Sequence, residues 1–419
     1  MKKNIYLDNL GKKALIASKS IVNLDEKTKN KVLNDYIVQL KKNIETILRS
    51  NKKDIEQARK KKIKEHIIER SILNRDRIES IIKSIKEVIK LKDPTKKIIS
   101  SWKRPNGLTI QRMTMPIGVI GVIYEARPNV TADISILCFK SGNCAILRGG
   151  TEAFYSNTIL ANLFRTVLKR NNINPDCIQL INKTKREYVD YMLSSMRTYI
   201  DVIVPRGGKS LVKKVLEISK VPVIGHLEGL CHIYVDKNAN LEMAKKVILN
   251  AKLRRTSICG AVETLLVDNK IIKTHLLPIV EMLHKHKCKI IGDKIVKKYF
   301  SKAKIATEKD WKTEYLDSII SIKIVKNIEE AIAHIKKYGT NHTESIITNN
   351  KKNAEKFLNE ITSSIVMHNT STQFADGYEF GLGAEVGIST NKLHPRGPVG
   401  LEQLTTYKYI VKGNGQIRP

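Results

Sequence analysis

The chain has 419 residues and a formal net charge of +34 at pH 7. Its length exceeds what a single compact core usually supports, so we expect more than one domain. The longest apolar run, Met115–Tyr124, is too short to cross a bilayer and is interrupted by Pro116, Gly118 and Gly121. These features exclude a membrane-spanning protein and predict a soluble one.

The excess of positive charge has two interpretations. A basic surface could bind nucleic acid or another polyanion. Lys, Ile and Asn are abundant throughout the sequence, however, and the lysines form no separate arm interleaved with aromatic residues. We therefore expect no specific nucleic-acid partner, although the charge could attract anionic substrates. The six cysteines are scattered without a CxxC pair, which is typical of a reducing compartment and predicts a cytoplasmic protein.

Residues 1 to about 92 are predicted to be helical, because apolar residues recur there at helical spacing. Examples are Val32, Leu33, Tyr36, Ile37, Leu40 and Ile44, and later Ile78, Ile81, Ile82, Ile85 and Ile89. Pro94 ends this region. The alternating segment 108–114 and the apolar, glycine-punctuated segment 116–125 are predicted to be strands.

Strand, turn and helix then alternate. The strand ending at Arg148 is followed by a helix over 151–170 with Thr151 as its N-cap, and the strand ending at Arg206 is followed by a helix over 209–220. A further strand is predicted from Val221 to Leu227. A second block of alternating strands and helices follows, and the chain ends in a β-like tail. This order predicts α/β architecture with parallel sheets.

The two strand–RGG–helix turns are the first candidates for a binding site. Glycine pairs allow the backbone to approach a ligand, and the helix N-terminus attracts phosphate. Arginine adds a bidentate partner for phosphate. Tight turns without a ligand are the alternative interpretation of Arg148–Gly150 and Arg206–Gly208. The GxGxxG pattern of ordinary dinucleotide-binding folds is absent.

Cys259 is the second candidate. It stands in a predicted loop beside Arg254 and Arg255, whose charge would favour a thiolate, and Gly260 leaves room for a substrate. A buried core cysteine is the alternative interpretation. His284, His286 and Cys288 could suggest a metal site, but they do not converge at helical spacing, so we expect no bound metal. No GxSxG motif indicates a serine hydrolase.

These segments together resemble a known family. PIGVIGVIYEARPNVTAD, AILRGG, IDVIVPRGG, AVETLLVD, FGLGAEVGIST and the segment from Val325 to Ile346 occur in this order. The chain is similar over nearly its whole length to the γ-glutamyl phosphate reductases, a branch of the aldehyde dehydrogenase superfamily. The resemblance implies an aldehyde dehydrogenase-like fold. It has a Rossmann-like parallel-sheet cofactor domain, an α/β catalytic domain and a small β element for oligomerisation.

The resemblance also implies domain boundaries. Residues 1–227 would form an NADPH-binding domain, whose strands near 105–118 contribute to oligomerisation. Residues 228–370 would form the catalytic domain with Cys259. Residues 371–400 would return to the cofactor domain, and 401–419 would form an oligomerisation tail.

The implied activity is the NADPH-dependent reduction of L-glutamate 5-phosphate to L-glutamate 5-semialdehyde, with release of phosphate, in proline biosynthesis. Cys259 would be the nucleophile that forms a thioester, and Asn129 would donate to the oxyanion. The cofactor would be bound by Arg148, Gly149, Gly150, Arg206, Gly207, Gly208 and Glu314. Arg127 and Arg396 would bind substrate anions. The implied partners are further copies of the same chain and, transiently, glutamate 5-kinase.

The segment around the nucleophile departs from the family. The family usually has Asn directly after the cysteine and often Pro shortly before it, where this chain has Gly260 and Thr256. We therefore expect a more mobile loop and lower activity. Two other functions remain open. An oxidising aldehyde dehydrogenase would hydrolyse the thioester, and a basic binding protein with a degenerate site would show salt-sensitive polyanion binding without turnover.

Overall fold

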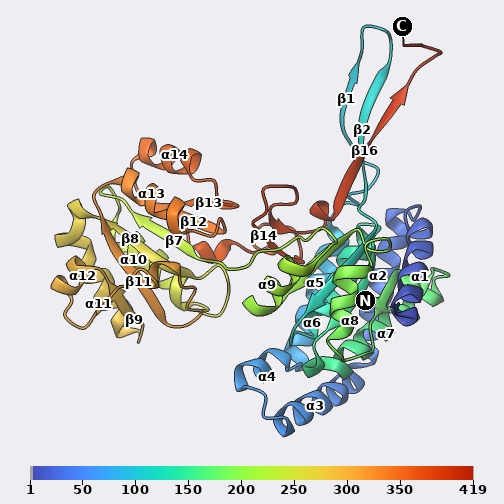
Figure 1. Ribbon diagram of the computed structural model, residues 1–419, viewed down its shortest axis with the longest axis horizontal. Helices are drawn as coiled ribbons and strands as arrows, with labels where there is room; N and C mark the ends of the chain where they lie inside the picture. Colours follow the sequence, from blue (N-terminus) through green and yellow to red (C-terminus); the bar gives the residue numbers. More distant parts are fainter. Residues whose placement is uncertain (1–2, 419) are drawn as a thin grey trace. The chain divides into compact units, whose positions relative to one another are not determined.

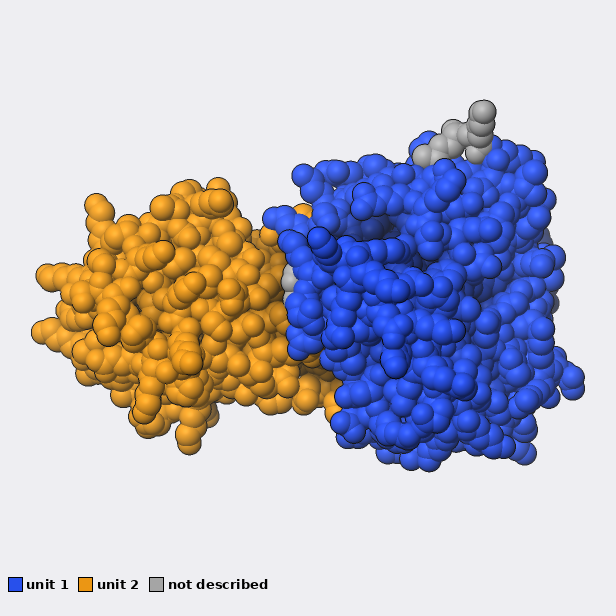
Figure 2. Space-filling model, turned by 90° about the horizontal axis from the view of Figure 1, so that it is seen from below, with its two compact units in different colours: residues 1–225, 381–387, 398–419 blue, residues 226–380, 388–397 orange. Residues whose placement is uncertain are grey.

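The computed structural model describes residues 3–418. Contacts divide the chain into two compact units, coloured separately in Figure 2. Unit 1 comprises the chain up to Gly225, the segment Gly381–Gly387 and the chain from Pro398 onward, and unit 2 comprises His226–Phe380 and Ile388–Gly397. The C-terminal part of the sequence thus contributes to both units. Among the described residues, no helix combines the length and the apolar character that crossing a membrane requires.

Unit 1 begins with five helices, which confirms the helical prediction for this region. They are α1 (Ile5–Ile21), α2 (Glu26–Lys42), α3 (Ile44–Lys60), α4 (Glu65–Ser71) and α5 (Arg75–Lys90). Their apolar faces bury such residues as Leu33 and Ile85 in one core with the sheet that follows. The helices α2 and α3 pack on α7 (Phe154–Arg170), and α5 packs on α6 (Asn129–Lys140).

A four-stranded parallel sheet forms the centre of unit 1. Its order is β5-β4-β3-β6, from β3 (Val119–Tyr124), β4 (Cys144–Gly149), β5 (Ile178–Leu180) and β6 (Val202–Arg206). The helix α8 (Glu187–Ser195) precedes β6, and the helix α9 (Lys209–Ile218) follows it. The strand order reverses between β3 and β6. In open α/β sheets the carboxyl edge at such a reversal is where ligands bind.

Two local predictions for unit 1 are wrong. The helix α7 begins after a 3₁₀ turn (Thr151–Ala153), and Thr151 is not its N-cap. The buried Asp54 of α3 accepts from the N–H groups of Tyr155 and Ser156 at 3.0 and 2.8 Å instead, so a distant carboxylate serves this helix end. The strand predicted over 221–227 is reduced to one bridge between Ile203 and Val223.

A separate antiparallel sheet in unit 1 stands out from its helices (Figure 1). It contains β1 (Ile98–Lys103), β2 (Thr109–Pro116) and the C-terminal β16 (Thr405–Lys412), in the order β1-β2-β16. The predicted β-like tail is therefore a strand. Most residues of β1 and β16 are exposed.

Unit 2 contains a parallel sheet of order β10-β9-β11-β8-β7-β12-β13. The strands are β7 (Cys231–Val235), β8 (Val262–Asp268), β9 (Lys289–Gly292), β10 (Lys304–Ile305), β11 (Ile319–Val325), β12 (Thr343–Ile347) and β13 (Ile365–His368). The helices are α10 (Leu241–Leu253), α11 (Leu277–Lys285), α12 (Lys294–Tyr299), α13 (Ile328–Tyr338) and α14 (Lys351–Glu360). Two short strands, β14 (Gly387–Ser389) and β15 (Gly397–Val399), pair separately.

Helices cover both faces of the unit 2 sheet (Figure 1). Ile233 and Leu265 face a core shared with α10, α11 and α12. Tyr234 and Leu266, which alternate with them, face a core shared with α13 and α14. A sheet that is buried on both faces needs continuous apolar strands, which explains the unbroken apolar runs in the sequence.

We predict that His334 of α13 makes the stability of unit 2 fall in mild acid. Its side chain is buried, and burial, reinforced by His232 and nearby lysines, lowers its pKa to about 2. Below pH ~6.5 the His334 side chain binds a proton in the unfolded chain but stays neutral in the folded protein. The free energy of unfolding therefore decreases as the pH falls.

Urea unfolding at pH ~7.5 and ~5.5, followed by Trp311 fluorescence, tests this prediction. The Trp311 ring lies 5.5 Å from that of His334. Wild type should lose about 1 kcal/mol more than His334→Phe between the two pH values. An equal loss in both proteins would contradict the prediction.

Candidate active site

Cys259 differs from the other cysteines in its exposure. It is partly exposed, whereas Cys138, Cys144, Cys177, Cys231 and Cys288 are buried. Burial raises the pKa of the Cys177 and Cys288 thiols to about 12, and it also raises that of the other three. A nucleophilic cysteine must reach its substrate and ionise. Of the six cysteines Cys259 alone is partly exposed, although its side chain also packs against the cluster of Ile365, Met367, Ala375 and Ile388.

The loop that carries Cys259 connects α10 to β8. Arg254 was expected to act on the thiol, but its exposed side chain donates from Nε to Oε1 of Gln373 at 2.9 Å. The amide of Gln373 in turn donates to the carbonyl oxygen of Ala251 at 2.8 Å. From the sheet below, the Cys231 thiol donates to the carbonyl oxygen of Cys259 at 3.1 Å. Side chains from two other segments therefore hold this loop.

A buried ion pair joins the two ends of the loop. Lys252, near the end of α10, contacts Glu263 at the start of β8 at 2.6 Å, and both side chains are fully buried. The other carboxylate oxygen of Glu263 accepts from the N–H of Leu316 at 3.2 Å. Burial raises the pKa of Glu263, and the Lys252 ammonium opposes this rise. Because an unpaired buried charge is costly, this pair fixes where the loop leaves the helix and enters the strand.

Gly229 lies against the backbone of Cys259. A Cβ atom at position 229 would lie 2.3 Å from the Cys259 carbonyl oxygen and 2.7 Å from its Cβ. The N–H of Gly229 donates to Oε1 of Glu314 at 2.9 Å. The proposed ribose-binding carboxylate of Glu314 is thus connected to the cysteine through one glycine.

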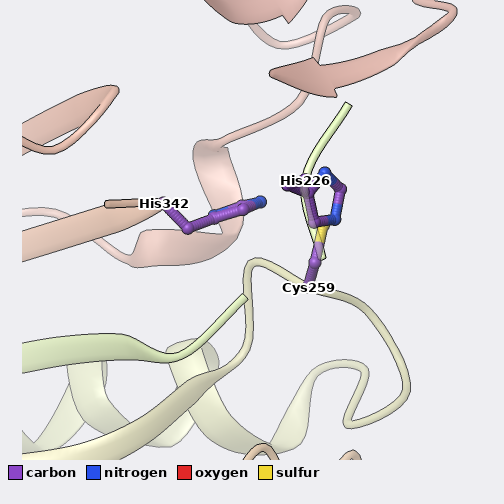
Figure 3. Close-up of side chains that lie close together, drawn as sticks. All are labelled: His226, Cys259 and His342. Atoms are coloured by element: carbon purple, nitrogen blue, oxygen red, sulfur yellow. The ribbon is translucent and has the colours of Figure 1, made fainter. Parts of the chain in front are cut away.

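Two imidazoles that sequence reasoning did not single out lie beside the thiol. The Sγ atom of Cys259 and one ring nitrogen each of His226 and His342 all lie within 4.8 Å of one another. Figure 3 shows the His342 ring pointing toward the other two side chains. The histidine rings meet edge to face, with centroids 4.8 Å apart. His226 follows the strand-like segment 221–225 and His342 precedes β12, so only their positions at the ends of these segments hinted at a site. His284, His286 and Cys288 form no such group within the described residues.

The first RGG turn lies at the carboxyl end of β4. Arg148 is mostly buried and donates to the carbonyl oxygens of Gly149 at 2.6 Å and Thr184 at 2.8 Å. Its Nε is buried without a hydrogen-bond partner. A Cβ on Gly150 would lie 2.4 Å from Glu152 and 3.3 Å from the backbone N of Ala126, so the turn approaches the end of β3 closely.

The second RGG turn lies at the strand-order reversal, at the N-terminus of α9. The N–H of Gly208 donates to the carboxylate of Glu125 at 2.7 Å. A Cβ on Gly207 would lie 2.6 Å from the same carboxylate. Nη1 of Arg206 lies 3.9 Å from Oε1 of Glu385. The expected phosphate position therefore already attracts one negatively charged group, as a helix N-terminus does.

The remaining predicted residues lie in different places. Asn129 begins α6 in unit 1, where its Nδ2 donates to Asp133 at 2.9 Å. Burial raises the pKa of Asp133 to about 6. Arg127, also in unit 1, precedes α6, and Arg396 belongs to unit 2 and donates to the carbonyl oxygen of Thr362. Their roles with substrate stay predictions.

Comparison with known proteins decides the family. Residues 27–300 match the aldehyde dehydrogenase family. The chain belongs to the aldehyde dehydrogenase family. Its curated relatives include proteins named gamma-glutamyl phosphate reductase, which place it in that branch. The one from Parvibaculum lavamentivorans is 49% identical over 99% of this chain and 98% of the relative, and the one from Brucella suis is 48% identical over 98% and 97%.

Solved structures agree with this membership of the aldehyde dehydrogenase family. The gamma-glutamyl phosphate reductase of Thermotoga maritima superposes with a TM-score of 0.96 at 45% identity, covering 99% of this chain and 100% of that one. An acetylating aldehyde dehydrogenase from Geobacillus thermoglucosidasius has a TM-score of 0.69 at 16% identity, covering 99% and 98%, and shows the shared fold. The predicted aldehyde dehydrogenase-like fold is confirmed.

Gly260, where the family usually has Asn, lies close to the backbone of a neighbouring segment. A Cβ at position 260 would lie 3.1 Å from the carbonyl oxygen of Thr372 and 3.5 Å from the Cα of Gln373. This contact is tight but less severe than the one at Gly229. A side chain therefore has more clearance at Gly260, within the loop, than at Gly229, which packs against the loop from just before β7.

We predict that Gly229→Ala impairs the site more than Gly260→Ala does. The first methyl group must displace the Cys259 backbone, which costs about 1–3 kcal/mol, as overpacking does. Thermal unfolding and the rate of Cys259 alkylation should both be affected more strongly in Gly229→Ala. The opposite order of the two variants would contradict this account of the loop.

Proposed function

We propose that this chain reduces L-glutamate 5-phosphate to L-glutamate 5-semialdehyde with NADPH and releases phosphate, in proline biosynthesis. The observation that carries the proposal is the partly exposed Cys259 thiol, held in a braced loop next to a parallel sheet, in a chain whose relatives are named gamma-glutamyl phosphate reductase. An acyl phosphate suits a thiol nucleophile, because phosphate is a good leaving group.

The covalent step follows from the chemistry of the cysteine. The Cys259 thiolate attacks the acyl carbon, the carbon–oxygen bond to phosphate breaks, and a thioester remains on the enzyme. The oxyanion formed during the attack needs hydrogen-bond donors. We propose the backbone N–H of Cys259 and the side-chain amide of Asn129 for this role. Asp133 holds that amide by the hydrogen bond described above.

The residues of unit 1 fit a nicotinamide cofactor. Two glycine turns lie at the carboxyl edge of the sheet, one of them at the strand-order reversal, and Arg148 has a buried Nε without a partner. We propose that Arg148, Gly149 and Gly150 bind the adenosine part and that Arg206, Gly207 and Gly208 bind the pyrophosphate. Glu314 would bind the nicotinamide ribose. The cofactor supplies the hydride that reduces the thioester. Arg127 and Arg396 are the proposed anion partners of the substrate.

The reverse assay tests this function. Glutamate semialdehyde, in equilibrium with its cyclic pyrroline form, is supplied with NADP and phosphate, and NADPH formation is followed. We expect a signal that requires phosphate. Cys259→Ser should lower the rate on the order of a thousandfold. Cys288→Ala, which changes a buried cysteine of the unit 2 core, serves as the control.

A signal that does not depend on phosphate would favour an oxidising aldehyde dehydrogenase instead. Full activity in Cys259→Ser would remove the thioester mechanism. Comparison of NADP with NAD in the same assay tests the cofactor preference. The transient complex with glutamate 5-kinase and the cytoplasmic location stay predictions.

We also propose that the chain forms a homo-oligomer through the antiparallel sheet of β1, β2 and β16. Tyr407, Tyr409 and Val411 of β16 are 46%, 56% and 57% exposed, and Trp102 of β1 packs edge to face on Tyr409. Exposed apolar strands with open edges usually pair with a second chain.

Light scattering after size exclusion tests the oligomer. We predict that Tyr409→Asp/Val411→Asp lowers the mass toward 47.5 kDa, the mass of one chain. Ile5→Asp, which changes an exposed apolar residue of α1 outside this sheet, should leave the mass unchanged. A wild-type mass of one chain would refute the proposal.

A further inference from the structure

The two imidazoles beside Cys259 have no role in the function proposed above. His342 is fully buried, and its Nε2 has no hydrogen-bond partner although it lies in the protein interior. Leaving such an atom unpaired costs about 1–3 kcal/mol. Its other ring nitrogen lies 2.9 Å from Thr343 Oγ1 and 3.6 Å from Cys231 Sγ. The ring is therefore held through Nδ1, and Figure 3 shows it pointing toward His226 and Cys259.

The partner of His226 determines its protonation pattern. Nδ1 of His226 lies 2.7 Å from the carbonyl oxygen of Ile388. A carbonyl oxygen can only accept, so Nδ1 carries the hydrogen. In the neutral ring Nε2 then has a lone pair and can accept a proton. His226 is also partly exposed, so a proton held there can leave the site.

We propose that His226 accepts the Cys259 thiol proton and that His342 positions and stabilises the resulting thiolate. The transfer of the thiol proton to His226 does not require the proposed function. Only the later transfer of that proton to phosphate rests on it. The atoms lie within 4.8 Å of one another. One bridging water spans about 5 Å between two hydrogen-bonding atoms, and catalytic contacts commonly shorten when substrate binds.

The proton balance closes over the reaction. The S–H bond of Cys259 breaks, its electron pair stays on sulfur, and the proton moves to Nε2 of His226. The thiolate forms the carbon–sulfur bond while the electron pair of the carbon–oxygen bond leaves with phosphate. The His226 imidazolium then gives its proton to that phosphate. After hydride transfer the thiolate is expelled, and a proton from solvent restores the thiol.

Carboxylates lie near the neighbouring Cys231 thiol. Glu263, Glu314 and Glu344 lie near enough to act on Cys231, whose pKa is raised well above its usual value, first by burial and then by these carboxylates. Cys231 therefore stays a thiol and donates to the Cys259 carbonyl. The Nε of Arg254, which was expected to act on the thiol, donates to Gln373 instead.

Alkylation by iodoacetamide, without substrate or cofactor, tests the inference independently of the reductase activity. Mass spectrometry measures the rate at Cys259 against pH in wild type, His226→Gln and His342→Gln. We expect His226→Gln to react at least tenfold more slowly near neutral pH and to approach wild type in alkali. Imidazole added to His226→Ala should restore part of the rate. His342→Gln should slow the reaction less.

The control His284→Gln removes an exposed imidazole elsewhere in unit 2 and should alkylate like wild type. If His342→Gln fails to fold, as shown by thermal unfolding, His342→Asn replaces it. Unchanged alkylation in His226→Gln, or loss in the His342 variants alone, would overturn the assignment of the proton acceptor. A wild-type rate that EDTA changes as strongly as His226→Gln does would indicate a bound metal and also overturn it.

Discussion

Gly229 lies so close to the backbone of Cys259 that a side chain at position 229 would clash with it. The arrangement of the site depends on this contact. The glycine allows β7 to begin directly beneath the loop, which brings the Cys231 thiol to the Cys259 carbonyl. Its N–H holds Glu314. Backbone groups fix a loop more firmly than long side chains do, because fewer rotatable bonds must be ordered. The thiol is therefore positioned by the start of the sheet.

Some lysines of this basic chain are buried, in unit 1 and in unit 2. Lys29, Lys140 and Lys252 are all buried. Lys29 pairs with Asp93 at 2.6 Å, and Lys252 pairs with Glu263 at 2.6 Å. These lysines are fixed structural groups, so they contribute nothing to a polyanion-binding surface. Most other ion pairs involve exposed side chains, whose individual contribution to stability is about 0–1 kcal/mol.

The wrong N-cap at Thr151 has a cause outside its local sequence. Thr151 has the right chemistry for an N-cap, yet Asp54 satisfies the N–H groups of that helix from another helix. The segment that follows β8 likewise forms a 3₁₀ turn and a π-helical turn (Ile272–Leu276) before the regular helix α11 starts at Leu277, next to Pro278. At both helix starts the element type is that of a helix, but its first residue depends on a distant contact or a proline, because helix ends depend on partners outside the local window.

The sequence was sufficient to predict the alternation of strands and helices, the family and the choice of Cys259, because apolar periodicity and motif order are properties of the chain. It did not show that five other cysteines are buried, that Arg254 turns to Gln373, or that two histidines more than a hundred positions apart meet at the thiol. Those facts depend on which strands lie side by side. Strand order is set by packing over the whole sheet, which no local window of the sequence contains.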